Sequence, residues 1–386
     1  MLAKPSPNVL QPAVLTCGVC GAEVPGDATL CPKCVAPINV ASIGDLAGDT
    51  DFCLTSLLQV LAEARRQQRA TVGPCDLWDA YLSAFWARPE TAIILWAEAK
   101  AALDAIQAIG RPSSPWLELG CGDGVHAALL NGWRFESSFD VFHATNAGAA
   151  DAYATFDATG FAPAITAQGR QIAVGVDLKP GAVERAAALG VFERVEQADV
   201  TKLPVPDVSM GVVFSNMLGQ LDEDAIAATL QEVHRVLRPG GVLLVSAMAE
   251  GFGDRLFFHP QADQAEAAND HAAARRLRRL DRGRHAFETA RSIDDWRDRF
   301  ASAGLSHVES RPLIGEPVLQ FWDTGLRPFF PQFKAARDSL CDAKAWDVVK
   351  PLLLAGLDAL LRPLLAEAID PAGPAGMHVH VVRKPE

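Results

Sequence analysis

Four cysteines near the start of this 386-residue chain have a spacing that could bind a metal. They form two Cys-x-x-Cys pairs, Cys17 with Cys20 and Cys31 with Cys34, separated by a short turn-rich stretch. Two such pairs can place four thiolates tetrahedrally around one Zn²⁺ at about 2.3 Å. Because every ligand is a thiol, we expect a closed, structural zinc site. The alternatives, chance pairs or a redox motif, would leave the turn residues in both pairs unexplained.

A second group that could do chemistry lies in Trp116-Leu-Glu-Leu-Gly-Cys-Gly-Asp-Gly-Val125. A short apolar run ends in Gly120, Gly122 and Gly124, and a helix-compatible stretch follows. This pattern predicts a buried strand that turns sharply into a helix. There the glycines let the backbone approach a ligand closely, and the helix start offers its N–H groups. Glu118 lies inside the predicted strand, where a carboxylate needs a partner such as a bound ammonium or hydroxyl.

Further polar residues stand at the ends of later apolar runs. Asp177 ends Ile172-Ala-Val-Gly-Val-Asp, and Asp199 and Asn216 hold comparable positions. In dinucleotide-binding folds the acid of the second strand follows the glycines by about 20 residues, whereas Asp177 follows Gly124 by 53. We therefore expect an insertion between them. Each acid could also be a simple turn or cap residue.

The segments that must position these groups form a regular series. Asp222 is expected to cap a helix over 223–237, which carries one apolar stripe. Arg238-Pro-Gly-Gly241 would stop that helix, and Val242-Leu-Leu-Val-Ser-Ala247 would form the next buried strand. Gly376-Met-His-Val-His-Val-Val-Arg383 suits a final antiparallel strand.

Four segments within residues 115–248 together resemble the class I S-adenosylmethionine (SAM) methyltransferases, of the methyltransferase type 11 kind. They are the glycine motif, Asp177 with its strand, the stretch from Asp199 to Leu218, and the helix, Arg-Pro-Gly-Gly and strand series. The resemblance implies an α/β fold: a Rossmann-like, seven-stranded, mostly parallel sheet with helical insertions. The cysteine pairs resemble a small N-terminal zinc ribbon.

The resemblance also implies roles for individual residues. In this family the glycine motif, here Glu118, Gly120, Cys121, Gly122 and Gly124, holds the cosubstrate. An acid matched by Asp177, followed by Leu178, accepts both ribose hydroxyls. An acid matched by Asp199, followed by Val200, accepts a hydrogen bond from the adenine amine, and Asn216 faces the methyl group.

The catalytic groups are harder to assign, because the sulfonium of SAM already activates the methyl group and the protein mainly aligns the reactants. A general base is needed only when the acceptor must lose a proton. Asn216 is the best candidate, with His126 and His143 as candidate bases. Enzymes of this family that methylate nucleobases or amides carry Asn/Asp-Pro-Pro-aromatic at this position. This chain has Ser215-Asn-Met-Leu218, which lowers the case for that class.

We expect three regions: a zinc ribbon over 1–40, a helical extension or lid over 41–110, and a methyltransferase domain over 111–386. The last would hold insertions at about 131–170, 250–285 and 317–375. The helical extension contains five aromatic residues: Trp78, Tyr81, Phe85, Trp86 and Trp96. Packing in the core is their favoured role, and lining a substrate pocket is the alternative. Six arginines between Arg275 and Arg284 form either a solvated helix face or a phosphate-binding patch.

The composition limits the choice of partners. Hydrophobic residues make up 49% and charged residues 21%, which is ordinary for a soluble, well-packed protein. The net charge of −12 argues against a broad nucleic-acid footprint. No secretory signal is visible, and the late apolar stretch 348–369 contains charges and prolines, so we expect a cytoplasmic protein without a transmembrane segment.

Three functions stay open at this point. The first is methylation of a small-molecule or lipid- or sugar-linked acceptor, on O, N or C. The second is an rRNA or tRNA base methyltransferase that holds RNA with its zinc ribbon and arginine cluster. The third is a non-catalytic interaction protein with a SAM-type fold. The sequence does not name the acceptor or the oligomeric state.

Overall fold

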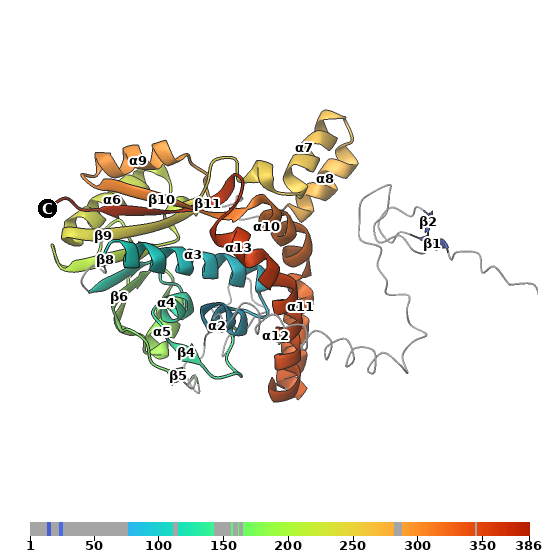
Figure 1. Ribbon diagram of the computed structural model, residues 1–386, viewed down its shortest axis with the longest axis horizontal. Coiled ribbons are helices and arrows are strands. Elements are labelled where there is room, and N and C mark those ends of the chain that lie inside the picture. Colours follow the sequence, from blue (N-terminus) through green and yellow to red (C-terminus); the bar gives the residue numbers. More distant parts are fainter. Residues whose placement is uncertain are drawn as a thin grey trace, which may run out of the picture. The chain divides into compact units, whose positions relative to one another are not determined.

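Seven strands form the central sheet of the computed structural model, in the order β10-β11-β9-β8-β3-β6-β7 (Figure 1). Strands β7, β6, β3, β8 and β9 pair in parallel, and β11 runs antiparallel to both β9 and β10. The predicted seven-stranded, mostly parallel sheet with a final antiparallel strand is thereby confirmed. The bounds are β3 Trp116–Leu119, β6 Ile172–Asp177, β7 Phe192–Gln197, β8 Met210–Ser215, β9 Leu237–Met248, β10 Ser306–Gly315 and β11 Ala375–Arg383.

The structure describes residues 14–16, 23–25, 76–110, 115–142, 156, 161, 165–281, 288–343 and 346–386. The chain divides into two units, 1–57 and 58–386. In the first unit, the described residues form an antiparallel pair of short strands, β1 (Val14–Thr16) and β2 (Glu23–Pro25). The sheet and all the helices below belong to the second unit.

Helices cover both faces of the sheet, as the apolar strands require. On one face lie α2 (Asp76–Ala84), α3 (Pro89–Ala108), α4 (Val125–Leu130) and α5 (Pro180–Leu189), and on the other lie α6 (Glu223–Val236) and α9 (Ile293–Ser302) (Figure 1). Alternate residues of one strand enter separate cores. Phe214 packs on the α3 side and Val213 on the α6 side. Asp222 caps α6 by accepting from the Ala225 N–H at 2.8 Å, as predicted.

The predicted insertions contain further elements. The first holds the short antiparallel pair β4 (Arg134–Phe135) and β5 (Ile165–Ala167). The second holds a helical hairpin, α7 (Phe258–Ala267) and α8 (His271–Leu280), which projects from the sheet in Figure 1. The third holds α10 (Glu316–Phe321), α11 (Phe330–Ala343), α12 (Trp346–Leu361) and α13 (Leu365–Ile369). The described residues also form single turns: η3 Leu218–Gln220, η4 Gly253–Arg255, the π-helical η6 Trp322–Leu326, η7 Arg327–Phe329 and η8 Arg362–Leu364.

The late helices are joined to α2 by buried polar contacts. Asp358 on α12 accepts from the Trp78 indole N–H at 2.6 Å, and Arg362 pairs with both Asp358 and Asp79. Leu357, Leu361 and Leu365 are buried in the core on the α3 side. This apolar stretch therefore packs into the core. None of the helices that the structure describes is long and apolar enough to cross a membrane.

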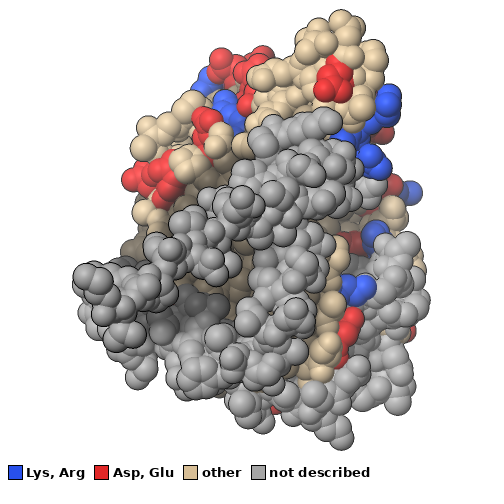
Figure 2. Space-filling model, turned by 90° about the vertical axis from the view of Figure 1, so that its right-hand side faces the viewer, with Lys and Arg blue, Asp and Glu red and all other residues tan. Residues whose placement is uncertain are grey.

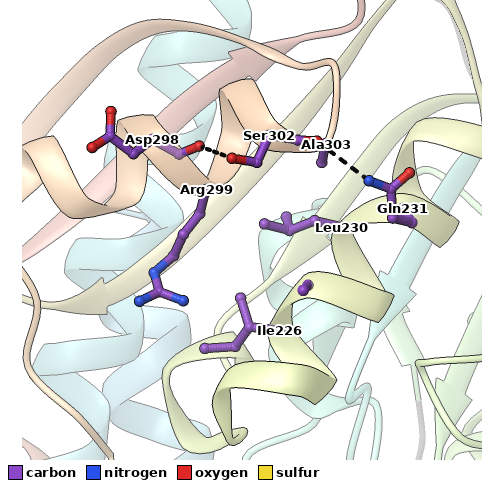
Figure 3. Close-up of a pocket in the computed structure, with 8 residues that line it drawn as sticks. Ile226, Leu230, Gln231, Asp298, Arg299, Ser302 and Ala303 are labelled. Atoms are coloured by element: carbon purple, nitrogen blue, oxygen red, sulfur yellow. Dashed lines mark hydrogen bonds between the residues drawn. The ribbon is translucent and has the colours of Figure 1, made fainter.

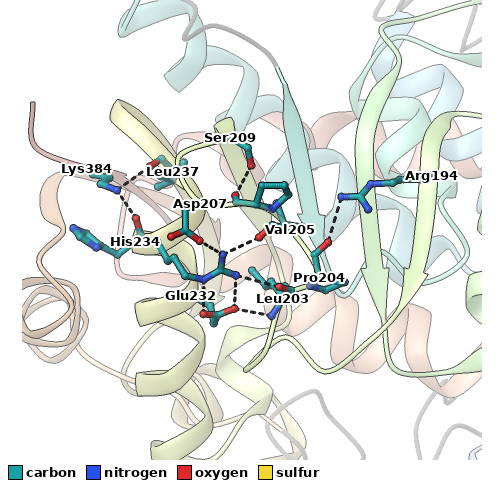
Figure 4. A network of polar contacts seen from close by, with 12 residues as sticks. Arg194, Leu203, Pro204, Val205, Asp207, Ser209, Glu232, His234, Leu237 and Lys384 are labelled. Atoms are coloured by element: carbon teal, nitrogen blue, oxygen red, sulfur yellow. Dashed lines mark hydrogen bonds and ion pairs between the residues drawn. The ribbon is translucent and has the colours of Figure 1, made fainter.

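A polar network holds the loop between β7 and β8 (Figure 4). Arg235 of α6 donates to the carbonyl oxygens of Leu203 and Val205 and pairs with Asp207 and Glu232. The Glu232 carboxylate in turn accepts from the Leu203 N–H at 2.7 Å. The Pro-containing loop is therefore fixed to α6 before the chain enters β8.

Candidate active site

The three glycines form a tight turn between β3 and α4. Gly120, Gly122 and Gly124 all have positive φ, at 67°, 55° and 79°. The N–H groups of Gly120 and Cys121 donate to the Val176 carbonyl of β6, at 2.8 and 3.0 Å. A Cβ added at Gly120 would lie 2.4 Å from Met217 Cγ, whereas one at Gly122 would meet nothing within 4 Å. Gly120 is therefore needed for packing, and Gly122 borders open space.

Asp177 lies directly against this turn although 55 positions separate it from Gly122. One carboxylate oxygen accepts from the Gly122 N–H at 2.9 Å, and the other accepts from the Lys179 N–H at 2.9 Å. Leu178, the neighbour named with it in the sequence analysis, is 67% exposed. The structure thus brings the predicted ribose-binding acid to the glycine turn.

Asp199 and Val200 follow β7 at the same edge of the sheet. The Ala198 N–H donates to the Asp177 carbonyl at 3.1 Å, which places this turn beside the end of β6. Asp199 is exposed, and hydrogen bonds from the backbone N–H and the hydroxyl of Thr201 lower the pKa of its carboxyl. Val200 is 7% exposed and packs into the core on the α6 side.

Glu118 carries the most unusual carboxyl group of the turn. It is 5% exposed, and within the described part of the chain no donor forms a hydrogen bond to it. Burial, with a smaller effect of the Asp123 carboxylate, raises the pKa of Glu118 to about 8. Below that pH the group keeps its proton, and a cation bound beside it would favour the carboxylate form. The ammonium and sulfonium groups of SAM are such cations.

Asp123 of the turn is held by a buried ion pair. Arg185 on α5 is fully buried and donates to Asp123 at 2.7 Å and to the Val141 carbonyl at 2.6 Å. Its guanidinium also lies 5.5 Å from the ring centre of Phe161. The second oxygen of Asp123 accepts from the Val125 N–H at the start of α4. The turn is therefore fixed from α5 as well as from β6.

His126 and Asn216, two of the three candidate catalytic residues, lie on the α3 side of the sheet. His126 is 8% exposed, and its Nδ1 lies 2.9 Å from the hydroxyl of Tyr81. Burial and the nearby carboxylates of Glu118 and Glu98 raise the pKa of Tyr81 well above its ordinary value, so this phenol keeps its proton. Asn216 follows β8, and its amide Nδ2 lies 3.2 Å from Glu98. His143 lies outside the described residues.

Two polar residues near the site, Tyr81 and Glu98, were not predicted from the sequence to contact the site residues. All five aromatic residues assigned to core packing are buried, which confirms that role, but Tyr81 also touches His126. Glu98 is the central acid of the apolar run Ile94-Leu-Trp-Ala-Glu-Ala99 on α3. A lone carboxylate on a buried helix face is the signal that could have identified it.

The predicted metal ligands cannot be placed. Cys17, Cys20, Cys31 and Cys34 all lie outside the described residues. Within the described ranges, no group of three or more His, Cys, Asp or Glu side chains is arranged to hold a metal ion.

A groove of about 320 Å³ lies between α6 and α9 on the opposite face (Figure 3). It is lined by apolar side chains such as Ile226 and Leu230 and by Arg299. None of the predicted site residues lines it. The candidate site is instead the edge of the sheet where β3, β6 and β8 end, with β7 beside them, which is where open α/β sheets bind ligands.

Part of this chain is similar in sequence to known proteins. Residues 158–245 match the family model described as a methyltransferase domain. The malonyl-[acyl-carrier protein] O-methyltransferase of Yersinia pestis is 37% identical over 83 residues, which are 22% of this chain and 31% of that protein. The enzyme of the same name from Hahella chejuensis is 45% identical over 74 residues, which are 19% of this chain and 26% of that protein.

The matched region, which is similar to a methyltransferase domain, contains Asp177, Asp199 and Asn216. It begins after the glycine turn, and the chain spans less than a third of the length of these curated relatives. A solved SAM-dependent methyltransferase from Mesorhizobium loti aligns with a TM-score of 0.36 and 16% identity, covering 73% of this chain and 97% of that one.

Proposed function

We propose that this protein transfers a methyl group from SAM to a small-molecule or lipid- or sugar-linked acceptor. The observation that carries the proposal is the hydrogen bond from the Gly122 N–H to Asp177, beside the buried Glu118, which accepts no hydrogen bond from the described residues. Glu118 would hold the ammonium group, and the backbone of Gly120, Cys121, Gly122 and Gly124 would border the cosubstrate. Asp177 and Leu178 would contact the ribose, with Asp199 and Val200 at the adenine.

The electrophile would come from SAM, whose sulfonium supplies an activated methyl group. The protein's own residues then align the acceptor, which in ideal cases is worth about 7–11 kcal/mol. Asn216 stands at the end of β8, where it can contact the acceptor. His126 shares a hydrogen bond with the protonated Tyr81, and that bond fixes the orientation of its imidazole.

The test has two steps. Calorimetric titration with SAM and with S-adenosylhomocysteine first establishes cosubstrate binding. SAM labelled in the methyl group is then incubated with the RNA, lipid and small-molecule fractions of a cell extract. Label in the small-molecule or lipid fraction supports the proposal. Label in RNA alone favours the RNA methyltransferase alternative, and SAM binding without any transfer favours a non-catalytic protein.

A carrier-linked acceptor is a second candidate, because both curated relatives named above act on malonyl-[acyl-carrier protein]. Arg275 and Arg279, one helical turn apart on α8, are exposed and form no ion pair within the described part of the chain. Figure 2 shows the side of the molecule from which the α7–α8 hairpin projects. Lys and Arg side chains (blue) lie next to the upper part of the molecule in this view. An acidic carrier protein or a phosphate would suit such a surface. Adding an acyl-carrier protein fraction to the labelling experiment tests this candidate.

We also propose a structural Zn²⁺ held by Cys17, Cys20, Cys31 and Cys34. Their spacing supports it, as does the pairing of β1 and β2, which flank the first Cys-x-x-Cys pair as the two strands of a hairpin. Metal analysis of the purified protein should give one zinc per chain, and Cys17→Ser with Cys20→Ser should remove it. SAM affinity should not change, because the proposed site lies in the other unit.

A further inference from the structure

Glu98 is a fully buried carboxylate that bridges two neighbouring strands from a helix. Its Oε2 accepts from the Asn216 amide at 3.2 Å, and its Oε1 accepts from the Ser246 hydroxyl at 2.9 Å. Helix α3 carries Glu98, β9 carries Ser246, and Asn216 follows β8. Three separate segments therefore meet at one carboxylate.

The sheet register explains why the two partners are side by side. Ser215 of β8 pairs with Val245 of β9, so Asn216 and Ser246 occupy the next row toward the carboxyl edge. Phe214 and Leu244, two residues before each of them, both pack on the α3 side. Asn216 and Ser246 thus share the face that α3 covers, and Glu98 reaches both from that helix.

The chemistry of this bridge fixes the direction of the Asn216 amide. Asn216 turns its Nδ2 toward Glu98, to which it donates at 3.2 Å, so its carbonyl oxygen points away from that carboxyl group. In the same way the Ser246 hydroxyl commits its one proton to Glu98. What Asn216 can then offer a ligand at the end of β8 is mainly its acceptor oxygen.

We propose that Glu98 is a positioning residue that orients Asn216 toward a methyl acceptor with an O–H or N–H group: an alcohol, a phenol, an amine or an amide. This inference rests on the proposed methyl transfer. The Asn216 carbonyl accepts a hydrogen bond from the acceptor's O–H or N–H and thereby aims the acceptor's lone pair at the methyl group of SAM. That lone pair would form the new bond to the methyl carbon as the carbon–sulfur bond breaks, with S-adenosylhomocysteine as the leaving group and the acceptor's proton released to solvent water. A free carboxylate offers no such donor.

The acceptor class can be tested without knowing the acceptor. The extract fraction that takes up label from methyl-labelled SAM is treated with mild base, which hydrolyses methyl esters and releases labelled methanol. Ethers, methylamines and methylamides keep their label. We expect the label to be stable to base, and release of most of it as methanol would overturn the proposed acceptor class.

The positioning role is tested with the same fraction by measuring rates at saturating SAM. We expect Glu98→Ala to lower the rate at least 30-fold while the dissociation constant for SAM changes less than threefold. Glu98→Gln should recover to within about fivefold of wild type, because its oxygen can accept from Asn216 while its amide donates to the Ser246 oxygen. Asn216→Ala should match Glu98→Ala, and the double variant should lose little more, since the two residues act as a unit.

Glu90→Ala is the matched control, because Glu90 is also a buried glutamate of α3 (7% exposed) but contacts Arg88 and Thr91. It should leave the rate at saturating SAM within twofold. A rate for Glu98→Ala within twofold of wild type would refute the positioning role, as would equal losses in Glu90→Ala and Glu98→Ala. If Glu98→Ala does not fold, failure of Glu98→Gln to exceed Asn216→Ala in rate would refute it instead. Absence of SAM binding by the wild-type protein would refute the proposed function itself.

Discussion

Replacing Gly122 by alanine separates the cost of backbone strain from the cost of blocking the ligand. Gly122 has φ of 55°, and an added Cβ would meet no protein atom within 4 Å. The only loss of stability should therefore come from the left-handed conformation, which costs a residue with a Cβ roughly 1–2 kcal/mol. Gly190 provides the control, because it has φ of 75° at the end of α5 and also has no neighbour within 4 Å of an added Cβ.

The two variants should differ in SAM affinity. If the open space beside Gly122 holds the cosubstrate, a methyl group there pushes the ligand away from the turn. A loss of about 2–3 kcal/mol of contacts corresponds to roughly 30- to 150-fold weaker binding. Urea unfolding should give similar stabilities for Gly122→Ala and Gly190→Ala, and calorimetry should show weak SAM binding only for Gly122→Ala. Equal SAM affinities in the two variants would refute the placement of the cosubstrate.

Three other substitutions test the same turn. Burial raises the folded-state pKa of Glu118 from 4.5 to about 8, so its contribution to stability is complete below pH 4.5 and is lost as the pH rises through 8, by at most about 1.4 kcal/mol per pH unit. SAM affinity should also rise between pH 6 and 8, because Glu118 ionises in that range. Glu118→Gln should remove both this rise and the pH dependence of stability in urea unfolding. An unchanged pH dependence of stability would contradict the assignment. Arg185→Met should cost about 3–5 kcal/mol because it leaves the Asp123 carboxylate buried without its cation, and Arg185→Met with Asp123→Asn should recover much of that loss. Asp177→Ala should leave the fold intact and reduce SAM affinity at least 100-fold by calorimetry, and an unchanged affinity would show that this carboxylate does not contact the ligand.

The sheet was predictable from sequence because each of its central strands is a short apolar run that ends in a glycine or a polar residue. Leu117, Val213 and Leu243 illustrate why such runs are read correctly: both faces of the sheet are covered, so nearly every position is apolar. The helix starts were predictable for a similar local reason. Asp222 sits where a cap must accept an N–H three residues on, and it does so.

The neighbours of the site were not predictable, because they depend on contacts between distant segments. Glu98 and Ser246 are 148 positions apart, and Trp78 and Asp358 are 280 positions apart. No local pattern couples such residues. The sequence analysis favoured core packing for Tyr81, and its burial agrees, but no local pattern could show that its hydroxyl would contact His126.

The partners of the buried acids distinguish those that hold the fold together from the one at the candidate site. Asp358 has Trp78 and Arg362 as partners, and Asp123 has Arg185, so each of these carboxylates is compensated within the chain and holds two segments together. Glu118 is equally buried, yet it has no donor among the described residues. Burial raises the pKa of Glu118 to about 8, so below that pH its carboxyl group keeps a proton, and a cation bound beside it would favour the ionised form. The position of that carboxylate, beside the turn where Gly122 borders open space, is therefore the strongest reason to place a cationic cosubstrate there.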